Sequence, residues 1–289
     1  MRCMLFLLLA FAIACQSPTP SSETVSAPTP VHNNGVTIAY SDTGRADTTL
    51  LFVHGWCINK SYWEAQVAHF AAHYRVVTID LPGFGDSGKN RDKWDTQTFA
   101  QDIDSVIAQL GLKNVVLIGH SMAGDIVLQS ATNNPGKVIG IVGVDNFKTV
   151  GRPFTKEDSA MYAKVIQEMK RDFKGTVMPY FGKELFSSTT PAAVKARVNQ
   201  DVERADTVIA VAAMAAAPID EGATLKTWGK ALYLVNSDVI PTDTTWLAAN
   251  HIPFHIEYTP GTGHYSMIEN AAAFNEKLEN ILRLIGKEK

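Results

Sequence analysis

Cysteine is scarce in this chain of 289 residues, which contains three, at positions 3, 15 and 57. Only Cys57 lies outside the N-terminal segment considered below, so no intrachain disulfide is available to hold the folded part together. Closely paired cysteines and the His-Glu-x-x-His pattern are also missing. We therefore expect packing to stabilise the fold, and we expect neither a metal ion nor another cofactor.

An excess of positive charge is missing as well. The chain has 26 lysines and arginines against 29 aspartates and glutamates, a net charge of −3 at pH 7, and no block of basic residues. Binding to nucleic acid needs a concentrated basic surface, so we exclude nucleic acid as a partner. With 46% hydrophobic residues, the composition is that of a folded globular protein.

The N-terminal apolar run, residues 4–14, is too short to span a bilayer comfortably. It follows Arg2 and ends in the small residues Ala12-Ile13-Ala14, which is typical of a signal peptide and its cleavage site. Together with Cys15, this junction resembles the lipobox of bacterial lipoproteins, in which the cysteine becomes the lipidated first residue. An ordinary secretory cleavage site is the alternative.

The segment behind Cys15 is rich in serine, threonine and proline up to residue 30 and has no apolar periodicity. Such a segment cannot bury enough surface to fold, so it predicts a flexible tether. We therefore expect a signal peptide over residues 1–14 and a tether over residues 15–30. The protein is then exported and lipid-anchored through Cys15 in the cell envelope, at the outer membrane or in the periplasm, or otherwise periplasmic or secreted.

After the tether, short continuous apolar runs alternate with helical stretches. We expect strands at residues 36–40, 50–53, 76–79, 115–118, 139–144 and 232–235, and helices at residues 63–72, 98–110, 122–133 and 271–285. Continuous apolar strands are typical of a sheet covered on both faces. The order predicts an α/β fold, with a mainly parallel sheet and flanking helices.

This alternation breaks at residues 147–222, where the pattern indicates helices and no strand. We expect a helical cap here, inserted after the sixth strand, above an α/β core made of residues 31–146 and 223–289. Aromatic and methionine side chains of the segment, Tyr162 and Met214 among them, either line a pocket or form the segment's own small core.

A serine stands between an expected strand and an expected helix, in Gly119-His120-Ser121-Met122-Ala123-Gly124. A nucleophilic serine must be exposed on a turn that is too sharp for large neighbours, and Gly119 and Ala123 are small residues at the required positions. The helix that follows adds its positive N-terminal end. This arrangement predicts Ser121 as a nucleophile.

Three motifs in this order resemble the α/β-hydrolase superfamily: His54-Gly55-Trp56, the glycine-rich residues 80–88, and the turn at Ser121. The chain looks like the helical-cap serine hydrolase branch, which includes small esterases, lactonases and cofactor-free perhydrolases. The similarity extends over nearly everything after about residue 31. It implies an α/β-hydrolase fold and a Ser-His-Asp triad.

The resemblance implies roles for further residues. The backbone N–H groups of Trp56 and Met122 would form an oxyanion hole, in which each donor is worth about 3 kcal/mol. The Trp56 ring would face the acyl pocket, or else pack under the cap. The predicted pocket consists of Trp56, His54, Tyr162 and Met214, and we also expect His54 to brace its loop.

The general base must be a histidine, because imidazole takes up and returns a proton near neutral pH. Eight histidines are present, and His264 lies in a glycine-rich loop, Gly261-Thr262-Gly263-His264, before the last expected helix. The resemblance implies that this loop holds the base. His120 adjoins Ser121, but on a turn that points neighbouring side chains apart. We therefore predict His264.

Two aspartates compete for the acid of the triad. Asp238 follows the expected strand at residues 232–235, and the chain order Ser121, Asp238, His264 is the order of this fold. Asp145 follows the strand at residues 139–144 and is the alternative acid. We predict Asp238 and keep Asp145 open, because Asn236-Ser237 replaces the usual glycine of the later loop.

These residues predict a serine hydrolase that cleaves a small carboxylic ester, lactone or thioester through an acyl-enzyme. The partner is then a small ester-type molecule. The alternative function is a non-catalytic cell-surface binding protein or receptor, which keeps the pocket but not the chemistry.

Overall fold

The computed structural model describes residues 29–287. The predicted signal peptide, Cys15 and most of the tether lie outside the described residues. Within residues 29–287, no helix combines the length and apolarity that crossing a membrane requires.

A seven-stranded sheet forms the centre of the molecule, in the order β3-β5-β4-β6-β7-β8-β9. All neighbouring strands pair in parallel except β3, which lies antiparallel to β5 at one edge. The strands are β3 (Tyr40–Asp42), β4 (Thr49–Val53), β5 (Arg75–Ile79), β6 (Val115–His120), β7 (Val138–Val144), β8 (Leu232–Ser237) and β9 (Phe254–Thr259). The predicted α/β fold with a mainly parallel sheet is confirmed.

A separate two-stranded hairpin precedes this sheet and consists of β1 (Val31–Asn33) and β2 (Val36–Ile38). The single strand predicted at residues 36–40 is therefore divided between β2 and β3. Ala39 lies between them, where its N–H donates to the Ser87 hydroxyl and its carbonyl accepts from the Asp80 N–H. These two bonds take the place of a continuous ladder.

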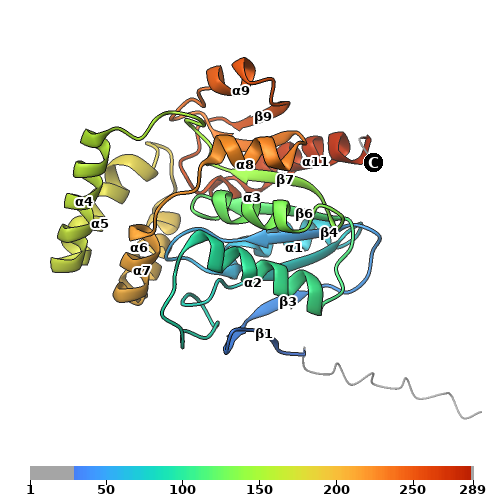
Figure 1. Cartoon of the computed structure of the whole chain (residues 1–289), viewed down its shortest axis with the longest axis horizontal. Helices are drawn as coiled ribbons and strands as arrows, with labels where there is room; N and C mark the ends of the chain where they lie inside the picture. Colours follow the sequence, from blue (N-terminus) through green and yellow to red (C-terminus); the bar gives the residue numbers. More distant parts are fainter. Residues whose placement is uncertain (1–28, 288–289) are drawn as a thin grey trace, which may run out of the picture.

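Helices cover both faces of the sheet (Figure 1). One face carries α2, α3 and α8, and the other carries α1 and α11. Their bounds are α1 (Glu64–Phe70), α2 (Thr96–Gln109), α3 (Ala123–Asn133), α8 (Glu221–Trp228) and α11 (Ala271–Lys287), with the short η1 (Lys60–Trp63), α9 (Thr245–Ala249) and α10 (Ser266–Glu269) in the loops.

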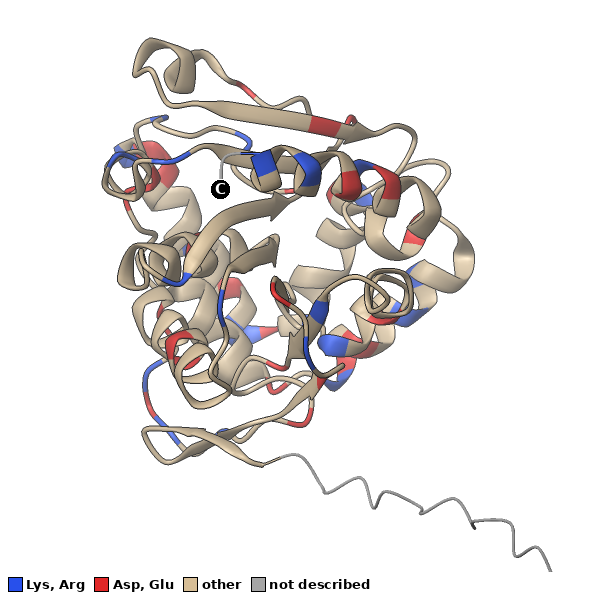
Figure 2. Ribbon diagram, turned by 90° about the vertical axis from the view of Figure 1, so that its right-hand side faces the viewer, with Lys and Arg blue, Asp and Glu red and all other residues tan. Residues whose placement is uncertain are grey.

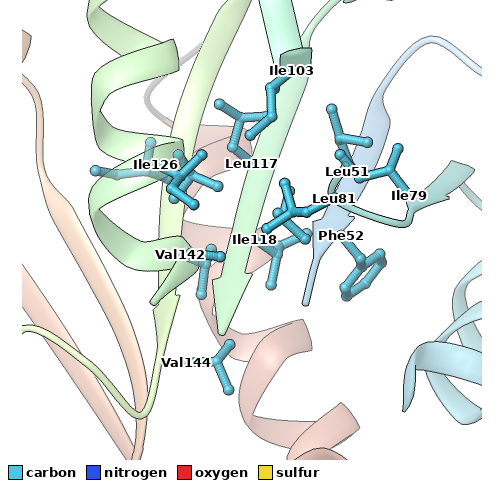
Figure 3. Packing of buried hydrophobic residues seen from close by; sticks show 14 of the residues in the cluster. Leu51, Phe52, Ile79, Leu81, Ile103, Leu117, Ile118, Ile126, Val142 and Val144 are labelled. Carbon is cyan, nitrogen blue, oxygen red and sulfur yellow. The ribbon is translucent and has the colours of Figure 1, made fainter. Parts of the chain in front are cut away.

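The core lies between these layers. Leu117 and Ile118 of β6 point to opposite faces of the sheet, as adjacent strand residues must, and neither is exposed. Figure 3 shows Leu117 beside Ile103 of α2. Charged residues are interspersed along the helices and loops, and the central strands carry few of them (Figure 2). The continuous apolar runs of the sequence therefore correspond to strands that are buried on both faces.

The segment between β7 and β8 is helical. It contains α4 (Lys156–Arg171), α5 (Phe173–Tyr180), the π-helical turn η2 (Phe181–Leu185), α6 (Ala192–Arg204) and α7 (Thr207–Ala215), ahead of α8. Helices α4 to α7 form a group at one end of the sheet, whereas α8 packs beside α3 (Figure 1). The insertion follows β7, the seventh strand along the chain, and not the predicted sixth. The five ranges expected before it correspond to seven strands, because the first is divided between β2 and β3 and because β1 precedes it.

Candidate active site

Ser121 occupies the sharp turn between β6 and α3. Its φ of +53° lies in the left-handed region, which a residue with a side chain adopts only where its surroundings impose it. Its N–H donates to the Val144 carbonyl on β7 over 2.9 Å, and its own carbonyl accepts from the Gly124 N–H over 2.9 Å. The turn is therefore fixed on both sides, and Ser121 is half-buried.

The neighbours of this turn have no space for larger side chains. A Cβ on Gly119 would lie 2.5 Å from the Ala123 carbonyl oxygen. Asn146 also holds the turn, because its Nδ2 donates to the carbonyls of Gly119 (2.8 Å) and Ser121 (3.2 Å). The sequence analysis did not identify Asn146, although its place directly after a strand that ends beside Ser121 was a usable signal.

His264 lies in the loop between β9 and α10 and makes a hydrogen bond to Asp145. The distance between His264 Nδ1 and Asp145 Oδ2 is 2.6 Å, and the two side chains are 12% and 8% exposed. Nδ1 donates in this bond because an ionised carboxylate can only accept. The pairing fixes the tautomer of His264 and leaves its Nε2 available as an acceptor.

Asp145 is held as an anion by several donors. The Ser237 N–H (2.9 Å), the Ser237 hydroxyl (3.0 Å) and the Lys148 ammonium (2.8 Å) all contact its Oδ1. Burial acts to raise the pKa of Asp145, but the hydrogen bond from His264 and the charge of Lys148 outweigh it and hold this pKa well below its usual range. Asp145 therefore stays ionised at any pH at which the fold would be used.

The structure does not bring Asp238 to His264, so the predicted pairing of these two residues is corrected to the alternative, Asp145. Asp238 is exposed, and its Oδ1 accepts the Gly261 N–H over 3.1 Å. The reason lies at the end of β8, where Ser237 directs its N–H and hydroxyl at Asp145. The later strand thus supplies donors to the acid rather than the acid itself.

The backbone on both sides of His264 is fixed as well. Its N–H donates to the Leu185 carbonyl of the insertion over 2.8 Å. Both oxygens of Glu269 accept backbone N–H groups, from Gly263 (2.9 Å) and Tyr265 (3.1 Å). The sequence analysis missed Glu269, which follows the histidine by five residues.

Trp56 joins the loop after β4 to the insertion. Its indole Nε1 donates to the Ala210 carbonyl on α7 over 2.9 Å. Its ring centroid lies 5.6 Å from that of Phe173 and 6.0 Å from that of Phe181. The half-buried Trp56 is therefore covered by helices of the insertion, while the half-buried Met122 lies between Ser121 and the first residue of α3.

The other predicted pocket residues are His54, Tyr162 and Met214. His54 is fully buried, with its Nδ1 donating to the Gly55 carbonyl (2.7 Å) and its Nε2 accepting the Leu81 N–H (2.9 Å). Burial lowers the pKa of His54, so it is neutral. The structure thus places this side chain under its loop and not in a pocket. Tyr162 and Met214 are both on the insertion, where the Tyr162 hydroxyl donates to the Met214 carbonyl.

A cleft of about 1100 Å³ lies beside the site, between the loops after β4 and β5 and residues 201–206 of the insertion. Neither Ser121 nor His264 lines it. Lys60 Nζ lies 2.7 Å from both Asp80 and Asp86, so one ammonium pairs with two carboxylates and the lining keeps an excess of acidic groups. Among residues 29–287, no three His, Cys, Asp or Glu side chains gather as metal ligands would. The reactive groups therefore lie at the ends of β6, β7 and β9, not in this cleft.

Comparison with known proteins identifies the fold family of the chain. The family described as alpha/beta hydrolase fold matches residues 48–201, which is more than half of the chain. A non-heme chloroperoxidase of Kitasatospora aureofaciens is 38% identical over 92 residues, 32% of this chain and 33% of that protein. A bifunctional esterase/perhydrolase of Acinetobacter calcoaceticus is 35% identical over 104 residues, 35% of this chain and 38% of that protein.

The matched stretch thus spans about a third of the length of these curated relatives. Solved structures extend the similarity of the fold to most of the chain. A thermophilic esterase from Thermogutta terrifontis superimposes with a TM-score of 0.75 at 24% identity, covering 89% of this chain and 97% of its own.

Proposed function

This chain belongs to the alpha/beta hydrolase fold family, and we propose that it is a serine hydrolase that cleaves a small carboxylic ester, lactone or thioester through an acyl-enzyme on Ser121. The observation that carries the proposal is the 2.6 Å hydrogen bond between His264 and an ionised Asp145, at the same end of the sheet as the strained turn of Ser121. The wording of the relatives' names, esterase and perhydrolase, supports acyl chemistry.

The reaction starts with Ser121 attacking the substrate carbonyl carbon while His264 Nε2 takes the hydroxyl proton. Asp145 holds Nδ1–H and stabilises the positive charge that His264 then carries. The alcohol leaves with the proton from His264, and a water molecule activated by the same nitrogen releases the acid from Ser121. The bond between the acyl group and the Ser121 oxygen forms in the first half of the reaction and is broken in the second, so the enzyme returns to its starting state.

The negative charge that develops on the carbonyl oxygen needs donors that are already in place. We assign this role to the backbone N–H groups of Trp56 and Met122, each worth about 3 kcal/mol in the transition state. Trp56 is held by Ala210, and Met122 by the fixed turn at Ser121. The contacts from Trp56 to the insertion support a role for these helices as a cap over the acyl side of the substrate.

The test is the turnover of p-nitrophenyl acetate and butyrate by the full chain, compared with Ser121→Ala and His264→Ala. We expect hydrolysis by the wild type and a loss of about 10³-fold or more in each variant. Ser61→Ala, which changes another half-buried serine, is the matched control and should retain activity. Equal hydrolysis by the wild type and Ser121→Ala would refute the proposal.

We also propose that the enzyme acts in the cell envelope, attached through lipidated Cys15. The apolar run, the small residues before Cys15 and the serine- and proline-rich tether support this location. Mass spectrometry of the protein from bacterial membranes should find a diacylglyceryl-modified Cys15, and Cys15→Ser should release the enzyme. A mature N-terminus without lipid would leave an exported, unanchored enzyme.

A further inference from the structure

A second histidine lies against the proposed base. His120 is the last residue of β6, immediately before Ser121, and it is only 1% exposed. Its ring centroid lies 4.6 Å from that of His264 and 5.4 Å from that of Tyr265. The turn does point Ser121 and His120 in different directions, but it directs His120 into the space beneath the loop that carries His264.

His120 is bonded to the backbone of that loop. Its Nε2 lies 2.9 Å from the carbonyl oxygen of His264. Because a carbonyl oxygen only accepts hydrogen bonds, Nε2 must carry the proton, and His120 is the Nε2–H tautomer. The proposed base, His264, is therefore held through its main chain by the neighbour of Ser121.

The other side of the His120 ring faces the loop that carries Trp56. A Cβ on Gly55 would lie 2.5 Å from His120 Nδ1, so the ring fills the space that a side chain at position 55 would need. Nδ1 is buried and has no hydrogen-bond partner among the described residues. His120 thus contacts the His264 loop through a hydrogen bond and the Trp56 loop through van der Waals packing.

His120 cannot replace His264 as the base. Burial, together with the neighbouring His264, lowers the pKa of His120 to about 3, so it remains neutral throughout the range in which the enzyme would work. The one N–H of its neutral ring donates to the His264 carbonyl oxygen. Because the His120 ring is neutral, it places no positive charge beside the imidazolium of His264.

We infer that His120 is a positioning residue, which sets the distance between the loop of His264 and the oxyanion-hole loop of Trp56. The inference rests on the function proposed above and goes beyond it, because it gives a role in the reaction to a residue that contacts no substrate. Loss of its donor would leave the carbonyl of the half-buried His264 without this bond and let the loop move. Displacing a reacting group by about 1 Å can cost about 100-fold in rate.

Two substitutions separate the hydrogen bond from the packing. His120→Gln keeps a donor close to the position of Nε2, whereas His120→Phe fills a similar volume without a donor. We expect kcat to fall about 10- to 100-fold in His120→Phe with little change in KM, and to stay within about threefold of the wild type in His120→Gln. His73→Phe, at an exposed histidine, is the matched control and should leave kcat unchanged.

A measurement without substrate completes the test. Nitrogen-15 NMR of the wild type should show His120 as a neutral Nε2–H tautomer between pH 5 and pH 8, and this readout stands even where His120→Phe does not fold. An active wild type with equal kcat for His120→Phe and His120→Gln, or an Nδ1–H tautomer, would overturn this inference alone. A wild type without hydrolysis would overturn the proposed function, and this inference with it.

Discussion

Replacing Asp145 by asparagine removes the charge beside His264 while preserving the size of the side chain. The side chains of Asp145 and His264 are 8% and 12% exposed and lie 2.6 Å apart at their nearest atoms, so solvent screens their interaction weakly. With charge centres about 4 Å apart and an effective dielectric constant of about 20, the attraction between carboxylate and imidazolium is about 4 kcal/mol. This charge pair exists only after His264 has taken the serine proton, so its loss raises the barrier to reaction.

A barrier higher by about 4 kcal/mol corresponds to a rate about 10³-fold lower. We therefore expect kcat/KM for p-nitrophenyl acetate to fall about 10³-fold in Asp145→Asn, measured at constant pH with the folded fraction checked by circular dichroism. Lys148 also donates to the carbonyls of Ser237 (3.0 Å) and Ile240 (2.8 Å), so it keeps two partners and the variant should fold.

Asp238→Asn is the matched control for this measurement. Asparagine can still accept the Gly261 N–H at the exposed end of β8, so we expect kcat/KM to stay within about threefold of the wild type. The reasoning fails if Asp238→Asn loses more activity than Asp145→Asn, because the charge at His264 would then come from the residue that the structure places elsewhere.

Two further predictions concern stability. Burial and the adjacent Asp125 raise the pKa of Glu221 to about 8 from 4.5. This carboxyl therefore stabilises the fold while protonated, and its contribution is lost as the pH rises towards 8. Glu221→Gln should melt at a higher temperature than the wild type at pH 9 but not at pH 4, and equal melting at pH 9 would contradict this. Gly119→Ala places a Cβ 2.5 Å from the Ala123 carbonyl, so urea unfolding should show a loss of about 1–3 kcal/mol, and an unchanged midpoint would disprove the crowding.

Local pattern was sufficient to predict the fold and the turn at Ser121. Continuous apolar runs predicted the buried strands β4 to β8, because strands covered on both faces have no polar side to reveal. The small residues around Ser121 predicted the turn, since the geometry at φ +53° excludes larger ones. The prediction of His264 came from the resemblance to the α/β-hydrolase superfamily, which implies that the glycine-rich loop before the last helix holds the base.

The choice between the two candidate acids required the three-dimensional structure. Asp145 and Asp238 each follow a strand, and β7 and β8 are parallel neighbours whose carboxyl ends meet at one edge of the sheet. Sequence spacing therefore places both near His264. The decision depends on the left-handed backbone of Asp145, with φ +48°, and on the donors of Ser237, neither of which has a signature in the sequence. The contact between His120 and the His264 carbonyl is equally invisible there, because 144 residues separate the two.

Labelling with a fluorophosphonate tests the central claim most directly, because this probe reacts only with a serine that is activated as a nucleophile. We would treat the full chain with the probe and locate the modification by mass spectrometry of its peptides. The account predicts one label, on Ser121, that disappears in His264→Ala as well as in Ser121→Ala. A folded wild-type protein that stays unlabelled would contradict it and would indicate a binding protein built on a hydrolase fold.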